Sequence, residues 1–558
     1  MGRRKEYALC LLAAASLFSM GCAGAGRFAL QSPVLQDRDN TPFAKAPPED
    51  AESDYANTLD VILLRPLSHA FLFESGGEAH NVNSLDEVPN STWYQNRKPT
   101  PAELDRGPCP DAGPSPPFTV KNSKTGGTTP GFVVKDSRGQ RYMVKLDGLG
   151  PRQPEISTAA DAIGSRLYWA IGFNAPCNDV VYVQTSDFRV DKKSTETLST
   201  GEKLPLTEAR LTEVLAKGTK DKNGLSRVSA SRFIDGEPVG TWRTEGTRKD
   251  DPNDLIPHEN RRELRGERFL AAWINHWDSR GPNTFDSFVK APKGGGYIVH
   301  YFLDFSDSFG ATPIRTEWPE PRMGFTTVSN VPAIAADAVG LGFVRRPWDE
   351  VTIDPRYPNL GFLDVAHFDP KAFSPQTPLV RWARAEPADL AWMARKIAGI
   401  GEEHVKAAVR VGKLSNPAEE AQLVRILMGR REKILKTSFA EVSPLADLNV
   451  TDGAFCFVDL GVEVGLSNRS RNVFTLEWRR GVDLTLTHPT PVLENPRGAE
   501  FCVPLPVHLD LTLPDNAPDR YATLDVIRVD RYGKTLLRAH FYDLGSARGY
   551  RLVGVERL

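Results

Sequence analysis

Short runs of alternating hydrophobic and polar residues mark the start of the folded chain. Strands are predicted at residues 118–121, 132–135 and 140–146, with NSKTGGTTPG joining the first two and DSRG joining the second pair. In the third run Arg141, Met143 and Lys145 share one face, because successive side chains of a strand point to opposite faces. Lys145 is therefore predicted to point to the same side of the sheet as Met143.

A helical period of hydrophobic residues follows the third strand. Apolar residues recur at positions 156, 159, 160, 163, 167, 170 and 171. The pattern predicts a helix that begins at Pro154-Glu155 and ends at Gly172, since proline suits the first turn of a helix and glycine its end. Further strands are predicted at residues 178–184 and at residues 231–237, where the chain runs into a hinge.

Helices and one hairpin fill the middle of the chain. Helical patterns span residues 259–277, 387–400, 402–411 and 417–437, and a hairpin is predicted over residues 283–304. Trp382 and Trp392 are predicted to lie in a core, since large aromatic side chains are mostly buried. Arg430 and Arg431 are predicted to lie on a solvated face, where arginine is usually found.

From about residue 441 the pattern changes to strands separated by Asn, Gly and Pro turns. The strands are predicted at residues 472–479, 482–487, 506–513 and 522–529. They predict a small all-β domain, a sandwich or barrel, over residues 441–558. Such an appended domain suggests a glycan or protein partner by analogy, and an equally simple interpretation is a module that packs against the rest of the chain.

The N-terminus combines basic residues with a short apolar run. Three bases at positions 3–5 precede an apolar stretch over residues 7–18, and small residues lead to Cys22. This pattern predicts a signal peptide over residues 1–21, because the run is too short to remain in a bilayer as a span.

The junction Ser19-Met20-Gly21-Cys22 resembles the lipobox of bacterial lipoproteins, with Ser19 where leucine is usual. The resemblance implies that Cys22 is lipidated and attaches the chain to a membrane of the bacterial cell envelope, at the outer membrane or the periplasmic face rather than in the cytoplasm. The alternative is a secreted protein with a free Cys22. Residues 22–54 predict a flexible tether, and residues 55–117 predict an irregular N-terminal extension.

Composition narrows the class of protein. A length of 558 residues predicts two or three domains, and 40% hydrophobic with 25% charged residues is typical of a soluble globular protein. The net charge of -2 argues against a nucleic-acid partner. Export permits disulfides, and the local pairing among the three that four mature-chain cysteines allow is Cys109 with Cys177 and Cys456 with Cys502.

Two acidic motifs carry the candidate chemistry. Residues 275–285, NHWDSRGPNTF, place Asp278, Arg280 and Asn283 in one turn-rich loop, and Asp304 ends the following hairpin within YFLDFSDSFG. Magnesium prefers one or two carboxylate or amide oxygens and takes the rest of its shell from water and phosphates, which suits Asn283 and Asp304. Taken singly, each aspartate is also explained as a turn or cap residue.

This order of elements and polar residues resembles that of protein kinases, which have a glycine-rich hairpin, a lysine on the third strand, a helix, an Asp-to-Asn catalytic loop and a metal-binding Asp. The match departs at the hairpin glycines, lacks an evident Ala-Pro-Glu element and has Asn-His-Trp-Asp where His-Arg-Asp is usual. The chain therefore looks like the atypical HipA, CotH and secretory-pathway kinase groups over roughly residues 118–440. Segments such as TTPGFVVKD and LDFSDSFG also look like an uncharacterised bacterial lipoprotein family.

The resemblance implies an α+β, bilobal protein-kinase-like fold, with an N-lobe at residues 118–242, a C-lobe at residues 243–440 and the β domain appended. It also implies Mg²⁺ and ATP, or another nucleotide, as cofactors. The implied site residues are Lys145, Gly126, Gly127 and Met143 around the nucleotide, Asn283 and Asp304 on the metal, Asp278 on the acceptor hydroxyl, and Arg280 near the transferred phosphate.

Two questions stay open at the level of sequence. Glu155 and Asp161 both border the apolar arc of the first helix and are both candidates to pair with Lys145; Asp161 is favoured, because a mid-helix aspartate is a poor helix former whereas the helix dipole explains a first-turn glutamate. The residues favour Mg-dependent phosphoryl transfer to an unknown acceptor. Export, which removes the chain from ATP, favours a non-catalytic, pseudokinase-like envelope protein that binds a ligand or partner.

Overall fold

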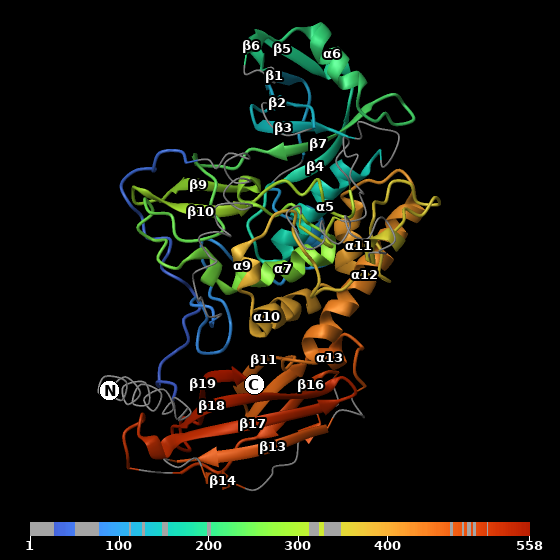
Figure 1. Cartoon of the computed structure of the whole chain (residues 1–558). Coiled ribbons are helices and arrows are strands. Elements are labelled where there is room, and N and C mark those ends of the chain that lie inside the picture. The colour runs from blue at the N-terminus through green and yellow to red at the C-terminus, as the bar shows by residue number, and fades with distance from the viewer. Residues whose placement is uncertain are drawn as a thin grey trace, which may run out of the picture.

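The computed structural model describes residues 27–50, 77–110, 113–124, 129–147, 154–197, 202–311, 323–327, 347–468, 473–481, 485–487, 493–494, 498–509 and 512–558. They form a sheet-based lobe, a mostly helical lobe below it, and a β domain at the opposite end of the molecule (Figure 1). The predicted signal peptide, Cys22, Gly126 and Gly127 lie outside the described residues. No helix among the described residues is long and apolar enough to cross a membrane.

The first lobe is a seven-stranded sheet in the order β4-β7-β3-β2-β1-β5-β6. Its strands are β1 (Phe118–Ser123), β2 (Gly131–Lys135), β3 (Arg141–Leu146), β4 (Asn178–Val183), β5 (Phe188–Thr197), β6 (Lys203–Pro205) and β7 (Ser226–Arg232). The alternation predicted for β3 is confirmed, because Tyr142, Val144 and Leu146 are buried in one cluster with the apolar face of α6 (Glu208–Ala216). Met143 and Lys145 lie half-buried on the opposite face.

Helix α5 (Ile156–Ile171) follows β3, as the helical period predicted, and lies between the sheet and the second lobe (Figure 1). Every residue of α5 except Ser157 and Trp169 is buried. A helix that is buried all round needs neighbours on every side, and α4 (Pro101–Arg106) and α11 (Glu402–Arg410) supply two of them. The position of α5 is thus set by both lobes.

The second lobe carries the main helical core. It contains α7 (Arg262–Ile274), α9 (Val380–Ala383), α10 (Pro387–Ala398) and α12 (Pro417–Phe439), with a sheet of β8 (Glu237–Gly240), β9 (Thr284–Lys290) and β10 (Gly296–Phe302). Although β8 lies within the residues predicted for the N-lobe, it pairs with β9 of the second lobe. Short 3₁₀ turns occur at η2 (Thr185–Asp187), η3 (His258–Asn260), η4 (Gly281–Asn283), η6 (Pro347–Glu350) and η8 (Pro518–Arg520).

Side chains of the second lobe confirm one sequence prediction and correct another. Trp382 and Trp392 are core residues as predicted, but the solvated face predicted for Arg430 and Arg431 is wrong. Arg430 donates to the carbonyls of α7 residues 272 and 273, and Arg431 donates to those of α10 residues 397 and 398. Both arginines therefore satisfy the exposed carbonyls at helix C-termini, where a positive charge is favourable.

The C-terminal domain is a β-sandwich. One sheet has the order β11-β12-β16-β15 and the other β14-β13-β17-β18-β19. The elements are β11 (Leu445–Thr451), β12 (Ala454–Asp459), α13 (Leu460–Glu463), β13 (Val473–Arg480), β14 (Thr485–Thr487), β15 (Leu493–Glu494), β16 (Glu500–Pro504), β17 (Tyr521–Asp530), β18 (Gly533–Asp543) and β19 (Tyr550–Arg557). Both sheets contribute to one core, which includes Phe457 from the first and Phe541 from the second.

Two further predictions concern this domain. The Cys456–Cys502 disulfide is confirmed and joins paired positions of β12 and β16. The strand predicted over residues 506–513 is wrong for the described residues of that range, because β16 has already ended at Pro504 and Pro506 has no N–H to donate to a sheet.

The flexible tether predicted for residues 22–54 is wrong over residues 27–50. The Phe28 ring lies 4.7 Å from the His540 ring on the sandwich, and Phe43 exchanges two backbone hydrogen bonds with Gly296 of β10, at 2.8 and 3.0 Å. The Phe28 ring and the Phe43 backbone thus attach this segment to the C-terminal domain and the second lobe.

Candidate active site

A buried ion cluster forms where the first lobe meets the second. The Lys145 ammonium, from β3, lies 2.9 Å from Asp304 Oδ1 and 3.9 Å from Asp161 Oδ2. Asp161 belongs to α5, and Asp304 follows β10. Burial alone would lower the pKa of Lys145, but Asp161 and Asp304 raise it above the ordinary value, so this lysine is charged.

Asp161 is held from several directions. Its carboxylate accepts hydrogen bonds from Asn178 Nδ2 at 2.9 Å, from Ser229 Oγ at 3.1 Å and from the backbone N–H of Phe305 at 3.3 Å. Asp161 is 1% exposed, and burial raises its pKa despite the nearby ammonium. Sequence reasoning missed Asn178 and Ser229, because each becomes a partner only when β4 and β7 pair in the sheet.

Glu155 is not part of this cluster. It precedes α5, and its Oε2 accepts a 2.8 Å hydrogen bond from the backbone N–H of Ser415, beyond α11. The alternative pairing of Glu155 with Lys145 is therefore wrong, because Glu155 is turned towards the second lobe, whereas the mid-helix acid Asp161 reaches the lysine.

The loop after α7 presents the other predicted polar groups. Asn283 Nδ2 donates to the carbonyl oxygen of Asp278 at 2.8 Å and to its Oδ2 at 2.9 Å, while Arg280 Nε lies 2.7 Å from Asp278 Oδ1. Burial raises the pKa of Asp278 to about 6, which Arg280 opposes and Asp304 reinforces. Since the amide nitrogen of Asn283 is committed to Asp278, its oxygen is the atom left to meet a cation.

The loop itself rests on a buried polar network. Glu267 of α7, with no exposed surface, accepts hydrogen bonds from Ser279 Oγ at 2.9 Å, Trp382 Nε1 at 2.6 Å and Tyr168 Oη at 2.5 Å. Arg381 donates to the Ser279 carbonyl at 2.7 Å. This support was missed in the sequence, because nothing local to Glu267 marks it as more than a helix-surface acid.

The Asp304 loop lies across from that network. Its backbone N–H at Leu303 donates to the Asn283 carbonyl at 2.9 Å, which sets the two loops side by side. Asp304 itself has a left-handed φ of 52°, a strained conformation for a residue other than glycine. Nearby Asp307 has a pKa raised to about 8 by burial and by Asp278 and Asp304.

The carboxylates at this lobe interface therefore outnumber the cations paired with them, which fits a divalent cation. Among the described residues, the only Cys, His, Asp or Glu groups whose ligand atoms all converge within 4.8 Å lie at the two disulfides. A magnesium ion does not need such a cage, because it keeps waters and substrate phosphates and takes only one or two protein oxygens. Asn283 and Asp304 are oxygen donors of that kind.

The remaining predicted nucleotide contacts are less complete. Met143 lies beside Ser231 in the β3–β7 pairing, and its half-buried side chain lies on the same face of the sheet as Lys145. Gly126 and Gly127 lie outside the described residues. Gly131, at the end of the same hairpin, is the register partner of Lys145.

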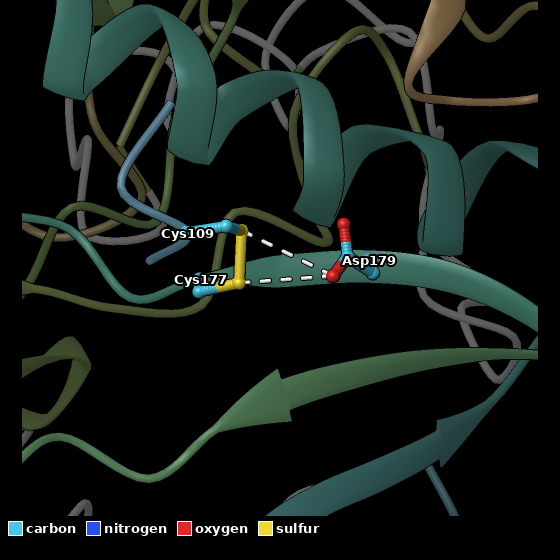
Figure 2. Close-up of side chains that lie close together, drawn as sticks. All are labelled: Cys109, Cys177 and Asp179. Atoms are coloured by element: carbon cyan, nitrogen blue, oxygen red, sulfur yellow. Dashed lines mark hydrogen bonds between the residues drawn. A yellow bond between two sulfur atoms is a disulfide. The ribbon is translucent and has the colours of Figure 1, made fainter. Parts of the chain in front are cut away.

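The group of Cys109, Cys177 and Asp179 contains metal-ligand residue types but is explained by a disulfide. Figure 2 shows Cys109 and Cys177 joined to each other, with Asp179 Oδ2 at 4.0 and 3.7 Å from their sulfurs. Disulfide sulfurs carry no thiolate and do not hold a metal as cysteine does, and Asp179 pairs with Arg166 at 3.0 Å. The predicted Cys109–Cys177 pairing is thus confirmed, and the group fastens the N-terminal extension to the start of β4.

No family model and no curated protein matches the sequence. Among solved structures, the Golgi casein kinase with Mn/ADP bound is similar at 10% identity over 61% of this chain and 76% of that chain, with a TM-score of 0.27. A second structure of that kinase has 11% identity over 61% of this chain and 75% of that chain, also with a TM-score of 0.27. The Rio2 kinase–ADP/Mg²⁺–phosphoaspartate complex from Chaetomium thermophilum is 12% identical over 53% of this chain and 73% of that chain, with a TM-score of 0.21. These TM-scores are low, and the kinase-like fold is assigned from the order and pairing of the elements above.

A substitution at Gly164 tests how the Asp304 loop is positioned. A Cβ at Gly164 of α5 would lie 2.5 Å from the Cβ of Phe305, which follows Asp304. We expect Gly164→Ala to lower the free energy of unfolding by about 1–3 kcal/mol through overpacking, measured by urea denaturation. Gly399→Ala is the control, since its Cβ would meet nothing nearer than 3.4 Å; equal stability of the two variants would contradict the tight contact.

His276 makes stability depend on pH. It is fully buried beside Ser308, and burial lowers its pKa to about 3, so the folded state keeps it neutral while the unfolded chain binds a proton below about 6.5. The stability of the folded state is therefore unaffected by His276 above pH 6.5, the pKa of the unfolded chain, and falls as the pH drops from 6.5 towards 3. Between pH 7 and pH 5 we expect His276 to account for about 2 kcal/mol of lost stability.

The measurement is urea denaturation at both pH values. His276→Phe should show a loss smaller by that amount than the wild type, whereas His80→Gln, which changes an exposed histidine, should lose as much as the wild type. An unchanged pH dependence in His276→Phe would refute the assignment.

Proposed function

We propose that this chain is a phosphotransferase that moves a phosphoryl group from a nucleotide to an acceptor hydroxyl with the help of Mg²⁺. The observation that carries the proposal is the meeting of Lys145, Asp161 and Asp304 from three separate elements, beside the loop of Asp278 and Asn283. Structural packing alone does not require so many ionised groups at one lobe interface, since burying them is costly.

Each residue has a role that its contacts support. Lys145 binds phosphate oxygens, and Asp161 keeps its ammonium in place. Asn283 Oδ1 and the Asp304 carboxylate would hold the metal, which when bound neutralises charge on the phosphates. Met143 borders the base of the nucleotide on the sheet side.

Asp278 orients the acceptor hydroxyl and accepts its proton. Its pKa, raised to about 6 mainly by burial, makes it a better proton acceptor than an exposed aspartate while leaving it ionised at neutral pH. Arg280, two residues on, sits where its charge can meet the transferred phosphate once it leaves Asp278.

A non-catalytic ligand-binding protein is the second candidate, and one observation favours it. Both carboxylate oxygens of Asp278 are engaged, one by Arg280 and the other by Asn283. A proton acceptor must first release one of them, whereas a protein that only binds nucleotide can keep both contacts.

The two candidates differ in what the aspartates do. With Mg²⁺ and ATP or another nucleotide at a hundred times its Kd, we expect about 2.7 kcal/mol of added stability, seen as a rise in Tm. Asp304→Ala should abolish that rise, while Asp278→Asn should keep it and lower phosphate transfer or hydrolysis about a hundredfold or more.

Asp354→Ala is the control, because that carboxylate pairs with Arg356 on the surface of the second lobe. Binding without turnover in the wild type would favour the non-catalytic candidate. No stabilisation by any nucleotide, with or without Mg²⁺, would contradict both.

We also propose that the chain acts at the bacterial cell envelope, held by lipid on Cys22. The proposal rests on the signal-like N-terminus and the lipobox-like junction. In membrane fractionation, Cys22→Ser should move the protein from the membrane to the soluble fraction. Retention of the variant in the membrane fraction would exclude this anchor.

A further inference from the structure

The cations near the ion cluster differ in how many carboxylates are paired with them. Lys145 faces two carboxylates, those of Asp161 and Asp304, and Arg280 is paired with Asp278. Neither brings unmatched positive charge to an anionic ligand. A polyphosphate that binds at this cluster must therefore find a cation elsewhere or displace an existing ion pair.

Lys124 is placed to be that cation. It directly follows β1, and its backbone N–H donates to the carbonyl of Gly131 at 2.8 Å; Gly131 is in turn the register partner of Lys145 on β3. Lys124, Gly131 and Lys145 thus form a row across three neighbouring strands. Residues that face one another across strands project to the same side, so both lysines project from the face of the sheet that carries the ion cluster.

Gly131 keeps the middle of this row open. A Cβ at Gly131 would lie 2.2 Å from the Val144 carbonyl oxygen, so no side chain fits there without a shift of the strand. No side chain therefore stands between the two lysines at Gly131.

Among the described residues, no carboxylate forms an ion pair with the Lys124 ammonium. Its hydrogen bond is to a neutral group, the carbonyl of Thr129 at 3.2 Å. Burial and the positive charge of Lys145 lower its pKa, while Asp304, Asp161 and Asp307 oppose that shift. The same charges that build the cluster around Lys145 therefore act on Lys124, which places its ammonium within electrostatic reach of that cluster.

We propose that Lys124 is a second phosphate-binding residue of the nucleotide site, contacting the polyphosphate from the hairpin side while Lys145 contacts it from β3. This inference rests on the proposed nucleotide-dependent function. A nucleoside triphosphate keeps negative charge even with a magnesium ion bound. Lys124 would exchange only its hydrogen bond to the Thr129 carbonyl for a stronger, charge-assisted bond to a phosphate oxygen. Lys124 contributes to affinity for the phosphates and not for the base.

The test compares Lys124→Gln and Lys124→Arg with Lys121→Gln. Lys121 lies on the same strand, but its ammonium pairs with Asp191 at 2.5 Å, on β5. Binding of ATP with Mg²⁺, GTP with Mg²⁺, and the parent nucleosides is measured by calorimetry at two salt concentrations. Unliganded Tm is recorded for each variant.

For whichever nucleotide the wild type binds, Lys124→Gln should weaken binding by about tenfold or more, as expected for a lost charge-assisted hydrogen bond. Its affinity for the parent nucleoside should stay within about twofold, and the salt dependence of nucleotide binding should fall. Lys124→Arg should restore most of the affinity, because it returns the charge. Lys121→Gln should bind like the wild type.

Three results would overturn the inference. Unchanged nucleotide binding in Lys124→Gln shows that Lys124 does not reach the phosphates. Equal loss for nucleotide and nucleoside, with a lowered unliganded Tm, shows that Lys124 only closes the hairpin through Thr129. If the wild type binds no nucleotide at all, the proposed function fails first and this inference with it, an outcome that the wild-type titration alone identifies.

Discussion

The pairing of Lys145 with Asp161 and Asp304 is the constraint on which the architecture depends. Three charges from a strand, a helix and the segment after a hairpin meet where the Lys145 side chain is 12% and that of Asp304 33% exposed, so each is stabilised by its partners more than by water. The two lobes must therefore meet in one arrangement. The strained backbone at Asp304 is consistent with that demand, because a relaxed loop would not deliver its carboxylate to the lysine.

Helix α5 carries the consequence. To keep Asp161 beside Lys145, the helix is fastened from both lobes: Arg166 donates to the Asn178 carbonyl on β4, and the buried Arg227 of β7 reaches the carbonyl of Lys413 beyond α11. The Cys109–Cys177 disulfide holds the extension that covers the same end (Figure 2). An arrangement locked in this way binds ligands with little reorganisation, at the expense of regulation by helix movement.

Sequence patterns predicted what local chemistry determines. The strands around Lys145, helix α5 and the preference for Asp161 follow from periodicity and from the poor fit of aspartate to a helix interior. The tether and the arginines of α12 were mispredicted, because composition does not reveal that Phe28 finds His540 or that Arg430 finds the end of α7. The partners of Asp161 were likewise set by sheet pairing, a long-range property that no short pattern encodes.

The Asp278 loop is built to be rigid before any ligand arrives. Glu267 has no access to water, and its burial is tolerated because Ser279, Tyr168 and Trp382 donate hydrogen bonds to its carboxylate. The same hydrogen bonds fix the position of the loop. Preorganised groups stabilise developing charge without the cost of turning to meet it. The ion pair between Arg280 and Asp278 is the exception, since the Arg280 side chain is 21% exposed and the pair joins residues that the proposed phosphoryl transfer would have to separate. Under the proposed function, the balance between catalysis and simple binding therefore depends on how readily a ligand phosphate would draw Arg280 away from Asp278.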